Sequence, residues 1–349
     1  MLKNINKIIF SIIFLLSCSG GGSSPASPDD GSDNNGGGGD SYVFPNATNF
    51  DRENQIEIIS WNIQTFPQLN TTSEYVKSLL ESWNADIYVF QEMGDNNTLI
   101  SMINAMPEYS YVLSSETSNW DFALVYKTAN SDCTACGTVT YNSHNELWAD
   151  TPNSNDNDND YENNALYQFA SRPPMENYLT WTNGTKSVDL YVTNIHYKCC
   201  GDGDLDITDK GAESTRRHYA STLLRDHIMN NRQGDYVVLA GDFNNIGDEQ
   251  SILNPSISPL TDPDQNSNYF KMVDEYVFAQ SSSTWSWQGW RSSFGAAHLD
   301  HIIINQPLFQ FESVSDGGII NMLNETGMSN YDIDDKLSDH QPSYYRFYP

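Results

Sequence analysis

The sequence is poor in basic residues. Lys and Arg number 17 against 46 Asp and Glu, which gives the 349-residue chain a formal net charge of -29 at pH 7. This excess of negative charge excludes a general electrostatic adhesion to DNA or to anionic lipid, because both are polyanions. Any polyanionic ligand therefore has to be held by a local site.

The apolar run near the N-terminus is too short to cross a membrane. Ile8–Leu16 falls well below the ~20 apolar residues that a spanning helix needs, and two lysines precede it. This pattern predicts an export signal peptide over residues 1–17. Leu15–Cys18 resembles the bacterial lipobox, which implies acylation of Cys18 and a lipoprotein anchored at the outer membrane or cell surface. A soluble secreted protein is the alternative.

Repeats and internal linkers are also lacking. No repeat of about 20 to 50 residues is present, and after residue 45 no long Gly, Ser or Pro tract divides the chain. Residues 18–45 consist almost entirely of Gly, Ser, Asp, Asn and Pro, a composition that cannot offset its ordering entropy. We therefore expect a flexible tether over 18–45 and one folded domain, monomeric, over 46–349.

Cysteine is scarce, with four residues beyond Cys18, and they stand as two close pairs. An oxidising compartment favours disulfides in an exported chain, with Cys133 and Cys136 as one candidate pair and Cys199 and Cys200 as the other. A zinc site is the alternative. It is disfavoured because the second pair is adjacent rather than separated by two residues.

Two segments, Asn155–Glu162 and Asp202–Asp209, are rich in acidic residues. They are typical of solvated loops. Oxygen-rich loops of this kind also hold structural Ca²⁺ in some proteins, although neither segment matches the full twelve-residue calcium-hand motif. Both interpretations stay open.

Short β-rich runs alternate with helical stretches along the chain, which predicts an α/β domain. Ala212–Met229 has apolar residues four apart and is expected to be a crossover helix. Asn142–Asn164 and Asn254–Asn268 have few apolar residues and are expected to be surface loops. The other expected elements are Ile56–Trp61, Glu74–Trp83, Asp86–Phe90, Asn97–Met106, Phe122–Tyr126, Val188–Ile195, Tyr236–Ala240 and His298–Ile304.

Several of these strands end in polar residues that metal and phosphate chemistry would use. One strand ends at Asn62, the next at Glu92, and a third at His196. A fourth ends in Gly-Asp-Phe-Asn, where a glycine allows a sharp turn and presents Asp242 and Asn244 toward a shared point. Near the C-terminus, Asp300 begins a strand, and Asp339 with His340 gives an adjacent acid and imidazole.

These motifs, Trp-Asn, Gln-Glu, Asn-Ile-His, Gly-Asp-Phe-Asn, Leu-Asp-His and Ser-Asp-His, resemble in type and order those of the endonuclease/exonuclease/phosphatase superfamily. That superfamily includes deoxyribonuclease I, abasic-site endonucleases and neutral sphingomyelinases. The resemblance covers roughly residues 56–346 and implies a four-layer α/β/β/α sandwich of the deoxyribonuclease I type, with the active site at one edge.

The resemblance also implies roles for single residues. Glu92 is expected to bind Mg²⁺ or Mn²⁺, with Asn62 and Asp339 nearby as further ligands. Hard oxygen ligands favour these cations. Catalytic roles are expected for the set His196, Asp242, Asn244, Asp300 and His340. Within that set, Asp242 and Asn244 are expected to orient the attacking water and the phosphate, and Asp300 to hold the acid/base His340.

Arg172, which precedes a proline, resembles an arginine that flanks the scissile phosphate in deoxyribonuclease-like members, and a surface arginine is the alternative. Cys133 and Cys136 are similar to the small disulfide loop of those enzymes. The resemblance implies a metal-dependent hydrolase of phosphodiesters. A nuclease acting on DNA is the first hypothesis, and a phosphodiesterase or phosphatase acting on lipid headgroups or small phosphate esters is the second.

Overall fold

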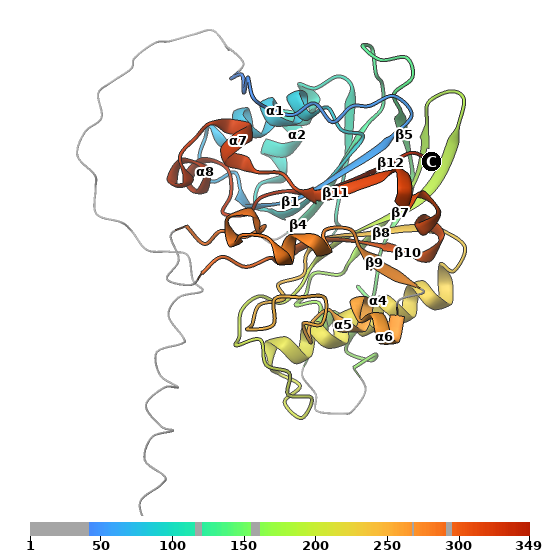
Figure 1. Cartoon of the computed structure of the whole chain (residues 1–349), viewed down its shortest axis with the longest axis vertical. Coiled ribbons are helices and arrows are strands. Elements are labelled where there is room, and N and C mark those ends of the chain that lie inside the picture. The colour runs from blue at the N-terminus through green and yellow to red at the C-terminus, as the bar shows by residue number, and fades with distance from the viewer. Residues whose placement is uncertain (1–41, 116–120, 155–160, 267–268, 291–294) are drawn as a thin grey trace, which may run out of the picture. The chain divides into compact units, whose positions relative to one another are not determined.

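The computed structural model describes residues 42–115, 121–154, 161–266, 269–290 and 295–349 (Figure 1). The expected signal peptide, Cys18 and nearly all of the expected tether lie outside these residues. Within them, the fold consists of two six-stranded sheets and the helices that cover them. None of the helices in this described part has the length and apolar character to cross a bilayer.

The first sheet contains the two strands that end at Asn62 and Glu92. β1 (Ile56–Phe66) and β2 (Ile87–Met93) are parallel neighbours, joined by the crossover helix α1 (Thr72–Trp83). Their carboxyl ends therefore meet at the same edge of the sheet. The full strand order is β11 (Ser315–Ile319), β12 (Ser343–Phe347), β1, β2, β4 (Asp121–Lys127) and β3 (Tyr109–Leu113).

The second sheet repeats this arrangement. β7 (Ser187–His196) and β8 (Tyr236–Asp242) are parallel neighbours, joined by the crossover helix α4 (Glu213–Asn231). The expected crossover helix is thus present, one or two residues from its predicted bounds. The full strand order is β5 (Thr138–Glu146), β6 (Met175–Thr182), β7, β8, β10 (Asp300–Asn305) and β9 (Phe270–Met272).

Helices form the two outer layers. α1, α2 (Asn96–Asn104), α7 (Met322–Thr326) and α8 (Asn330–Lys336) lie on the outer side of the first sheet, and α4, α5 (Ser258–Thr261) and α6 (Pro263–Asn266) lie beyond the second (Figure 1). The remaining short helices are α3 (Ala165–Gln168), η1 (Glu275–Ala279), η2 (Ser282–Thr284) and η3 (Gln306–Val314). This four-layer sandwich confirms the expected fold class.

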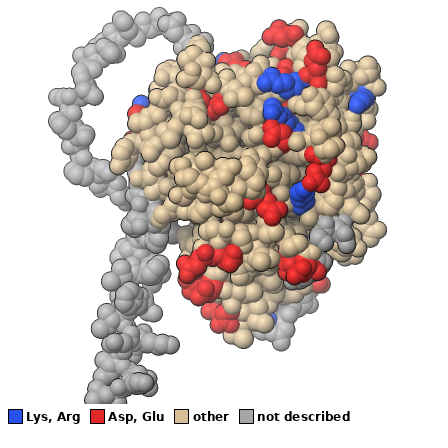
Figure 2. Space-filling model, in the orientation of Figure 1, with Lys and Arg blue, Asp and Glu red and all other residues tan. Residues whose placement is uncertain are grey.

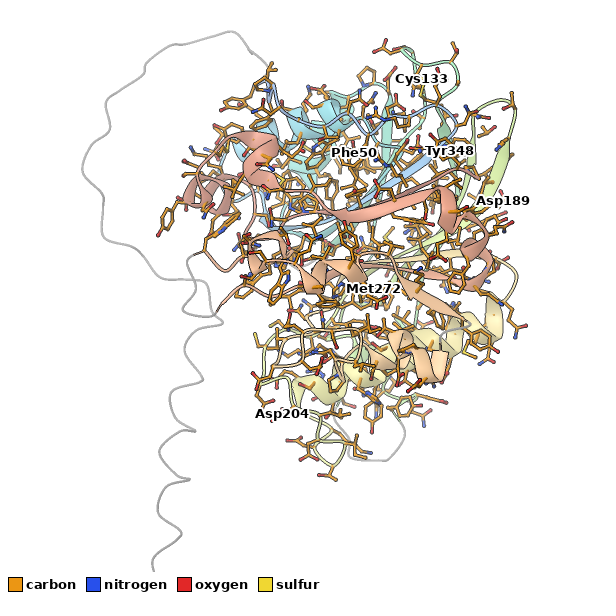
Figure 3. The ribbon with its side chains drawn as sticks, in the orientation of Figure 1. Phe50, Cys133, Asp189, Asp204, Met272 and Tyr348 are labelled. Atoms are coloured by element: carbon orange, nitrogen blue, oxygen red, sulfur yellow. A yellow bond between two sulfur atoms is a disulfide. The ribbon has the colours of Figure 1, made fainter. Side chains whose placement is uncertain are left out.

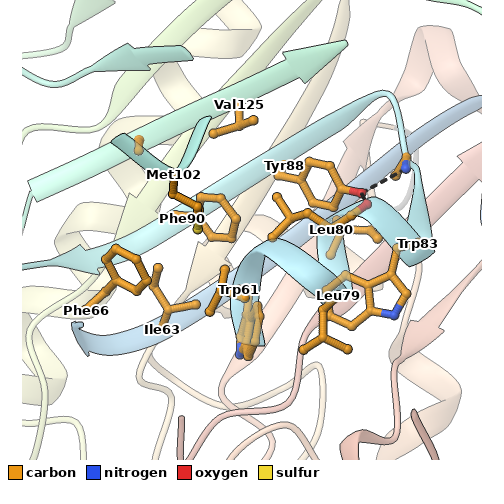
Figure 4. Close-up of a cluster of buried hydrophobic side chains, with 14 of the residues drawn as sticks. Trp61, Ile63, Phe66, Leu79, Leu80, Trp83, Tyr88, Phe90, Met102 and Val125 are labelled. Atoms are coloured by element: carbon orange, nitrogen blue, oxygen red, sulfur yellow. Dashed lines mark hydrogen bonds between the residues drawn. The ribbon is translucent and has the colours of Figure 1, made fainter. Parts of the chain in front are cut away.

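Three apolar clusters fill the spaces between the layers. Alternate residues of β1 enter different clusters: Ile58 packs between the two sheets, whereas Trp61 packs between the first sheet and its helices. Figure 4 shows the latter cluster, where Trp61 meets Trp83 of α1 with ring centroids 5.6 Å apart. The third cluster lies between the second sheet and α4 with α5. β1 is covered on both faces, so its residues from Ile56 to Ile63 are all buried, the polar ones included.

Both expected surface loops contain regular structure, so these two expectations were wrong in part. Residues 142–146 belong to β5 and pair with β6, where sheet hydrogen bonds order a polar segment that has little to bury. Within 254–268, α5 buries Leu260 in the cluster beneath α4. In each case, contacts with a distant part of the chain stabilise regular structure that the local sequence does not predict.

Acidic side chains gather in clusters on the face drawn in Figure 2, and basic side chains are few there. One acidic cluster lies at the lower end of the view, where Figure 3 labels Asp204. In this loop Asp202 and Asp206 accept hydrogen bonds from backbone N–H groups two residues on, at 3.0 and 2.9 Å. The loop is thus ordered by its own carboxylates, and Ca²⁺ binding there stays a prediction. Most of the other acidic segment, 155–162, lies outside the described residues.

Candidate active site

The side chains at the carboxyl ends of the parallel strands come together, and Asn62 joins the two sheets. Its Nδ2 atom donates to Oε1 of Glu92 at 2.9 Å and to Oδ2 of Asp242 at 3.1 Å. Asn62 is fully buried, and its own Oδ1 accepts from the backbone N–H of Gln64 at 3.1 Å. One amide therefore fixes a carboxylate from each sheet at a single point.

Glu92 lies at an irregular point of β2. Its backbone φ is 63°, in the left-handed region that non-glycine residues rarely adopt, and Gln64 and Thr65 on the facing turn also have positive φ. Backbone strain of this kind concentrates at functional sites. The Thr65 N–H donates to Oε2 of Glu92 at 3.2 Å. Burial raises the pKa of Glu92, against the lowering effect of the hydrogen bond from Asn62.

Asp242 is the most central acid of the site. Its Oδ1 accepts from the N–H of Asn244 at 2.8 Å, and Asn244 reaches back to the carbonyl of Tyr197 at 3.2 Å. Burial, followed by the negative charge of Asp300, raises the pKa of Asp242 to about 8. Gly241 is required for close strand contact, since a Cβ there would lie 1.9 Å from the carbonyl oxygen of Ile195 on β7. The glycine thus sets the approach of β8 to β7 rather than only a turn.

His340 and Asp300 form a buried pair. His340 Nδ1 lies 2.7 Å from Asp300 Oδ2, and the exposed fraction of each residue is 6% or less. His340 Nε2 lies 3.9 Å from Oδ1 of Asp339. Burial alone would lower the pKa of His340, but the charges of Asp300 and Asp339 outweigh it and raise that pKa well above its ordinary value. The two carboxylates therefore favour the charged form of this imidazole.

The pKa of His196 shifts in the opposite direction to that of His340. Nη1 of Arg172 lies 3.2 Å from both ring nitrogens of His196, and Nη2 of Arg172 donates to the carbonyl of Tyr197. Burial, with the positive charges of Arg172 and His340, lowers the pKa of His196 well below its ordinary value. His196 Nε2 also lies 3.7 Å from Glu92 and 3.6 Å from Asp242. An imidazole next to a guanidinium is suited to contact an anionic substrate.

The structure brings together every residue predicted for the site. Glu92, His196 and Asp242 form one group of potential metal ligands, and Asp242, Asp300 and His340 form another, with ligand atoms within 4.8 Å of one another in each. Asp339 contacts the indole N–H of Trp287 at 2.8 Å. The predicted ligand set of Asn62, Glu92 and Asp339 therefore stays a prediction.

Ser286 was missed by the sequence reasoning, although it holds the acid/base pair in place. Its Oγ accepts from the backbone N–H of Leu299 at 2.9 Å and of Asp300 at 2.8 Å, and its carbonyl accepts from Gln341 N at 2.6 Å. The next residue, Trp287, forms a β-bridge to His340. This segment thus joins the two chain regions that supply the pair. Three tryptophans, Trp285, Trp287 and Trp290, make this segment conspicuous in the sequence. Nothing in the sequence shows what the segment contacts.

A second cluster behind the site was also missed. Asp274, His298 and His301 are fully buried, with Asp274 Oδ2 at 2.8 Å from His298 Nε2 and 2.7 Å from His301 Nδ1. His301 Nε2 lies 3.0 Å from Oδ1 of Asn245, which follows Asn244 directly. The cluster therefore supports the loop after β8. The buried carboxylate is the partner that allows both histidines to lie inside the fold.

The two cysteine pairs differ. Cys133 and Cys136 are joined by a disulfide, as expected. The expected bridge between Cys199 and Cys200 is not formed, and the two sulfur atoms lie 2.8 Å apart in thiol contact. The backbone explains this difference, because Arg217 donates to the carbonyls on both sides of Cys199, those of Lys198 at 2.9 Å and Cys200 at 2.8 Å.

The sequence profile described as Endonuclease/Exonuclease/phosphatase family matches residues 59–340, which include every residue predicted for the site. The chain belongs to this family. An endonuclease/exonuclease/phosphatase enzyme is a hydrolase of phosphate ester bonds, and enzymes of this family generally use divalent metal ions such as Mg²⁺ or Mn²⁺. Among curated proteins, none matches the sequence well enough to count as a relative.

Solved structures of endonuclease/exonuclease/phosphatase proteins share this fold at low sequence identity. D. rerio TDP2 in complex with a single-strand DNA product is 14% identical, with a TM-score of 0.55 over 84% of this chain and 98% of that chain. A family protein from Bacteroides thetaiotaomicron is 15% identical, with a TM-score of 0.55 over 85% and 98%. The catalytic domain of Xenopus laevis APE2 is 19% identical, with a TM-score of 0.52 over 84% and 92%. These likenesses establish the fold.

Proposed function

We propose that the protein is an exported, lipid-anchored phosphodiesterase that cleaves DNA with Mg²⁺ or Mn²⁺. The observation that carries the proposal is the contact of Asn62 with both Glu92 and Asp242, because it brings the acids of both sheets to one point. Around that point lie the imidazoles of His340 and His196 and the guanidinium of Arg172. This is the set of groups that stabilises a phosphodiester during attack by water.

The residues present fit a divalent cation. Oδ1 of Asp339 is buried and accepts no hydrogen bond from any described residue, and the same holds for Oδ1 of Asp300. Buried carboxylate oxygens without a donor are costly unless a cation satisfies them. We propose that Glu92 and Asp339 hold the metal, with Asn62 beside them. A cation bound there would offset negative charge on the phosphate.

The remaining residues act either on the attacking water or on the leaving oxygen. Asp242 is fixed by Asn62 and by the N–H of Asn244, and its raised pKa suits a carboxylate that accepts a proton from the attacking water. His340, held by Asp300, donates a hydrogen bond to the phosphate and a proton to the leaving oxygen. Water attack and leaving-group protonation are thus assigned to different groups.

DNA is proposed as the substrate because the site itself supplies the positive charge that the rest of the chain lacks. Arg172 reaches His196, and its Nε is buried with no acceptor within the described part of the chain, so a phosphate oxygen could serve as one. The guanidinium fork is well suited to phosphate. The neighbouring D. rerio TDP2 structure holds a single-strand DNA product, which supports the same substrate class here.

The proposed location rests on the N-terminal residues alone. An apolar run preceded by lysines and followed by Cys18 supports export and lipid anchoring. The tether would place a monomeric enzyme at the cell surface, where it would meet extracellular DNA.

The function is tested with the full chain in Mg²⁺. Substrates would be bis-p-nitrophenyl phosphate, labelled single-stranded and double-stranded DNA, RNA of the same sequence, and sphingomyelin vesicles. We expect cleavage of the generic diester and of DNA, and loss of both on chelation with EDTA. Glu92→Gln serves as the inactive reference, which separates the activity from a contaminating nuclease.

Cleavage of sphingomyelin with intact DNA would replace the proposed substrate by the lipid-headgroup alternative. An enzyme that cleaves none of these phosphodiesters in Mg²⁺ or Mn²⁺ would contradict the proposed function. Because all arms use the same preparation, the two outcomes are distinguishable.

A further inference from the structure

Cys199 and Cys200 lie three and four residues after His196, in the segment that joins β7 to α4. Both residues are half-buried, and their Sγ atoms lie 2.8 Å apart. The sulfurs of a disulfide are about 2.05 Å apart, so the pair is in contact without being bonded. Closing the bond requires a sulfur movement of less than about 1 Å.

The backbone around the pair is held in the open state. Cys200 has a φ of 76°, which non-glycine residues rarely adopt. Arg217, which is fully buried, holds the two peptides that flank the cysteine pair by its hydrogen bonds to the carbonyls of Lys198 and Cys200. Any covalent change at the pair must therefore act on the contacts of Arg217.

The same segment supports the phosphate-binding side of the site. The carbonyl of Tyr197, two residues before Cys199, accepts from both Arg172 and Asn244. A movement of this segment would displace the acceptor that orients the arginine. The thiol pair is thus connected to the site by backbone hydrogen bonds.

Cys199 is in a chemically reactive environment. Its Sγ lies 3.8 Å from Nζ of Lys198 and receives the thiol contact of Cys200. The hydrogen bond from Cys200, followed by the charges of Lys198 and Arg172, lowers the pKa of Cys199 to about 5. The thiolate is the nucleophile of thiol–disulfide exchange, so Cys199 is the residue that would attack first.

We propose that Cys199 and Cys200 are a redox-modification site, which small disulfide compounds convert reversibly into a vicinal disulfide that weakens phosphodiester binding. This inference rests on the proposed function. The Cys199 thiolate attacks one sulfur of the external disulfide, releases one thiol and forms a mixed disulfide. Deprotonated Cys200 then attacks the sulfur of Cys199 and releases the second thiol. Two electrons and two protons pass from the cysteine pair to the external disulfide.

Closure lowers activity through the backbone. The ring that forms includes the Cys199–Cys200 peptide, so closure changes the torsions of this peptide and weakens the hydrogen bond from Arg217 to Cys200 O. The carbonyl of Tyr197 shifts with the segment, and Arg172 loses its orientation toward the phosphate. The expected kinetic change is a rise in KM for a phosphodiester, with a smaller effect on kcat.

The full chain would be equilibrated with oxidised or reduced glutathione, alkylated with iodoacetamide and mapped by peptide mass. We expect both cysteines to be alkylated in the reduced sample and the bridged peptide to predominate in the oxidised one. With bis-p-nitrophenyl phosphate in Mg²⁺, kcat/KM should fall several-fold on oxidation and return with dithiothreitol. Cys199→Ser and Cys200→Ser should keep the reduced-state activity and lose the response.

Cys136→Ser is the matched control, because it removes the other disulfide and should leave the response unchanged. Alkylation of both cysteines after oxidation would overturn the proposal, as would a bridged enzyme with unchanged kinetics. Persistence of the response in both serine variants would also overturn it. A reduced enzyme without activity would contradict the proposed function and with it the regulation, while alkylation would still show whether the bridge forms.

Discussion

His340 Nδ1 lies 2.7 Å from Asp300 Oδ2, although 40 positions separate the two residues in the chain. The carboxylate fixes the orientation of the ring and leaves Nε2 to face the substrate. We therefore expect the two residues to act as one catalytic unit. His340→Ala should lower kcat by about 10²–10⁴-fold, the usual contribution of a positioned proton donor.

Asp300→Asn should cost less than His340→Ala, and the double variant should be little worse than His340→Ala, because residues that act as a unit are not additive. Steady-state kinetics with bis-p-nitrophenyl phosphate would measure this, with His144→Ala on the edge strand β5 as the control. Fully additive losses would contradict a shared role.

The pH profile reports the charge of the same imidazole. The charge of Asp300 raises the pKa of His340 against the lowering effect of burial, so activity that needs the protonated ring is present below this pKa and lost as pH rises through it. Asp300→Asn removes the raising charge. The alkaline limb of kcat should therefore move to lower pH in this variant, and an unmoved limb would show that His340 does not titrate in the reaction.

Glu92→Gln should remove metal-dependent activity while leaving the fold intact. The amide keeps the shape and a hydrogen-bonding oxygen but loses the charge that attracts a hard dication. Isothermal titration with Mn²⁺ and turnover against metal concentration would both show weaker binding, and Glu81→Gln, exposed on α1, is the matched control. Wild-type turnover at low micromolar metal would contradict this role.

Ser286→Ala should lower kcat with little change in KM, because Ser286 positions the acid/base pair and does not touch substrate. Two buried N–H groups lose their acceptor, at a cost of about 1–3 kcal/mol each in stability. Ser286→Thr keeps the hydroxyl and should restore kcat. Equal losses of activity in the Ala and Thr variants would argue against the hydroxyl, and Ser101→Ala, exposed on α2, controls for the substitution itself.

Acid should destabilise the fold through Asp274 and His298. Burial and the charge of His301 lower the pKa of His298. Burial alone would raise the pKa of Asp274, but His301 and His298 outweigh it and hold that pKa below its ordinary value. The unfolded chain thus binds protons at Asp274 and His298 more tightly than the folded chain does. The stability contributed is present above the unfolded pKa values of about 6.5 and about 3.9 and is lost as pH falls below them.

Urea unfolding between pH 7 and pH 2 would measure this loss. Asp274→Asn should be less stable at pH 7 and should lose less stability than the wild type below about pH 3.9, where the unfolded wild-type carboxyl group becomes protonated, whereas Asp204→Asn on the exposed loop should follow the wild type. If the free energy of unfolding of Asp274→Asn and of the wild type fell in parallel with pH, the cluster would not contribute to destabilisation by acid.

The sequence by itself determined the fold class and most of the residues that converge at the site. Strand-end side chains such as Asn62, Glu92 and Asp242 follow apolar runs directly, and parallel strands must place their carboxyl ends at one edge. The family motifs also predicted that Asp300 and His340 act together. The hydrophobic periodicity alone would not have paired these two residues.

Only the tertiary structure decided which of these residues contact one another. Three features depend on burial and on neighbours distant in sequence: the contact of Asn62 with both sheets, the hydrogen bond that Asp300 donates to Ser286, and the opposite pKa shifts of His196 and His340. The same holds for polar segments that become regular structure only when a partner pairs with them. Local sequence fixes which groups a strand presents, whereas the dielectric and hydrogen-bond partners that set their chemistry come from the packed fold.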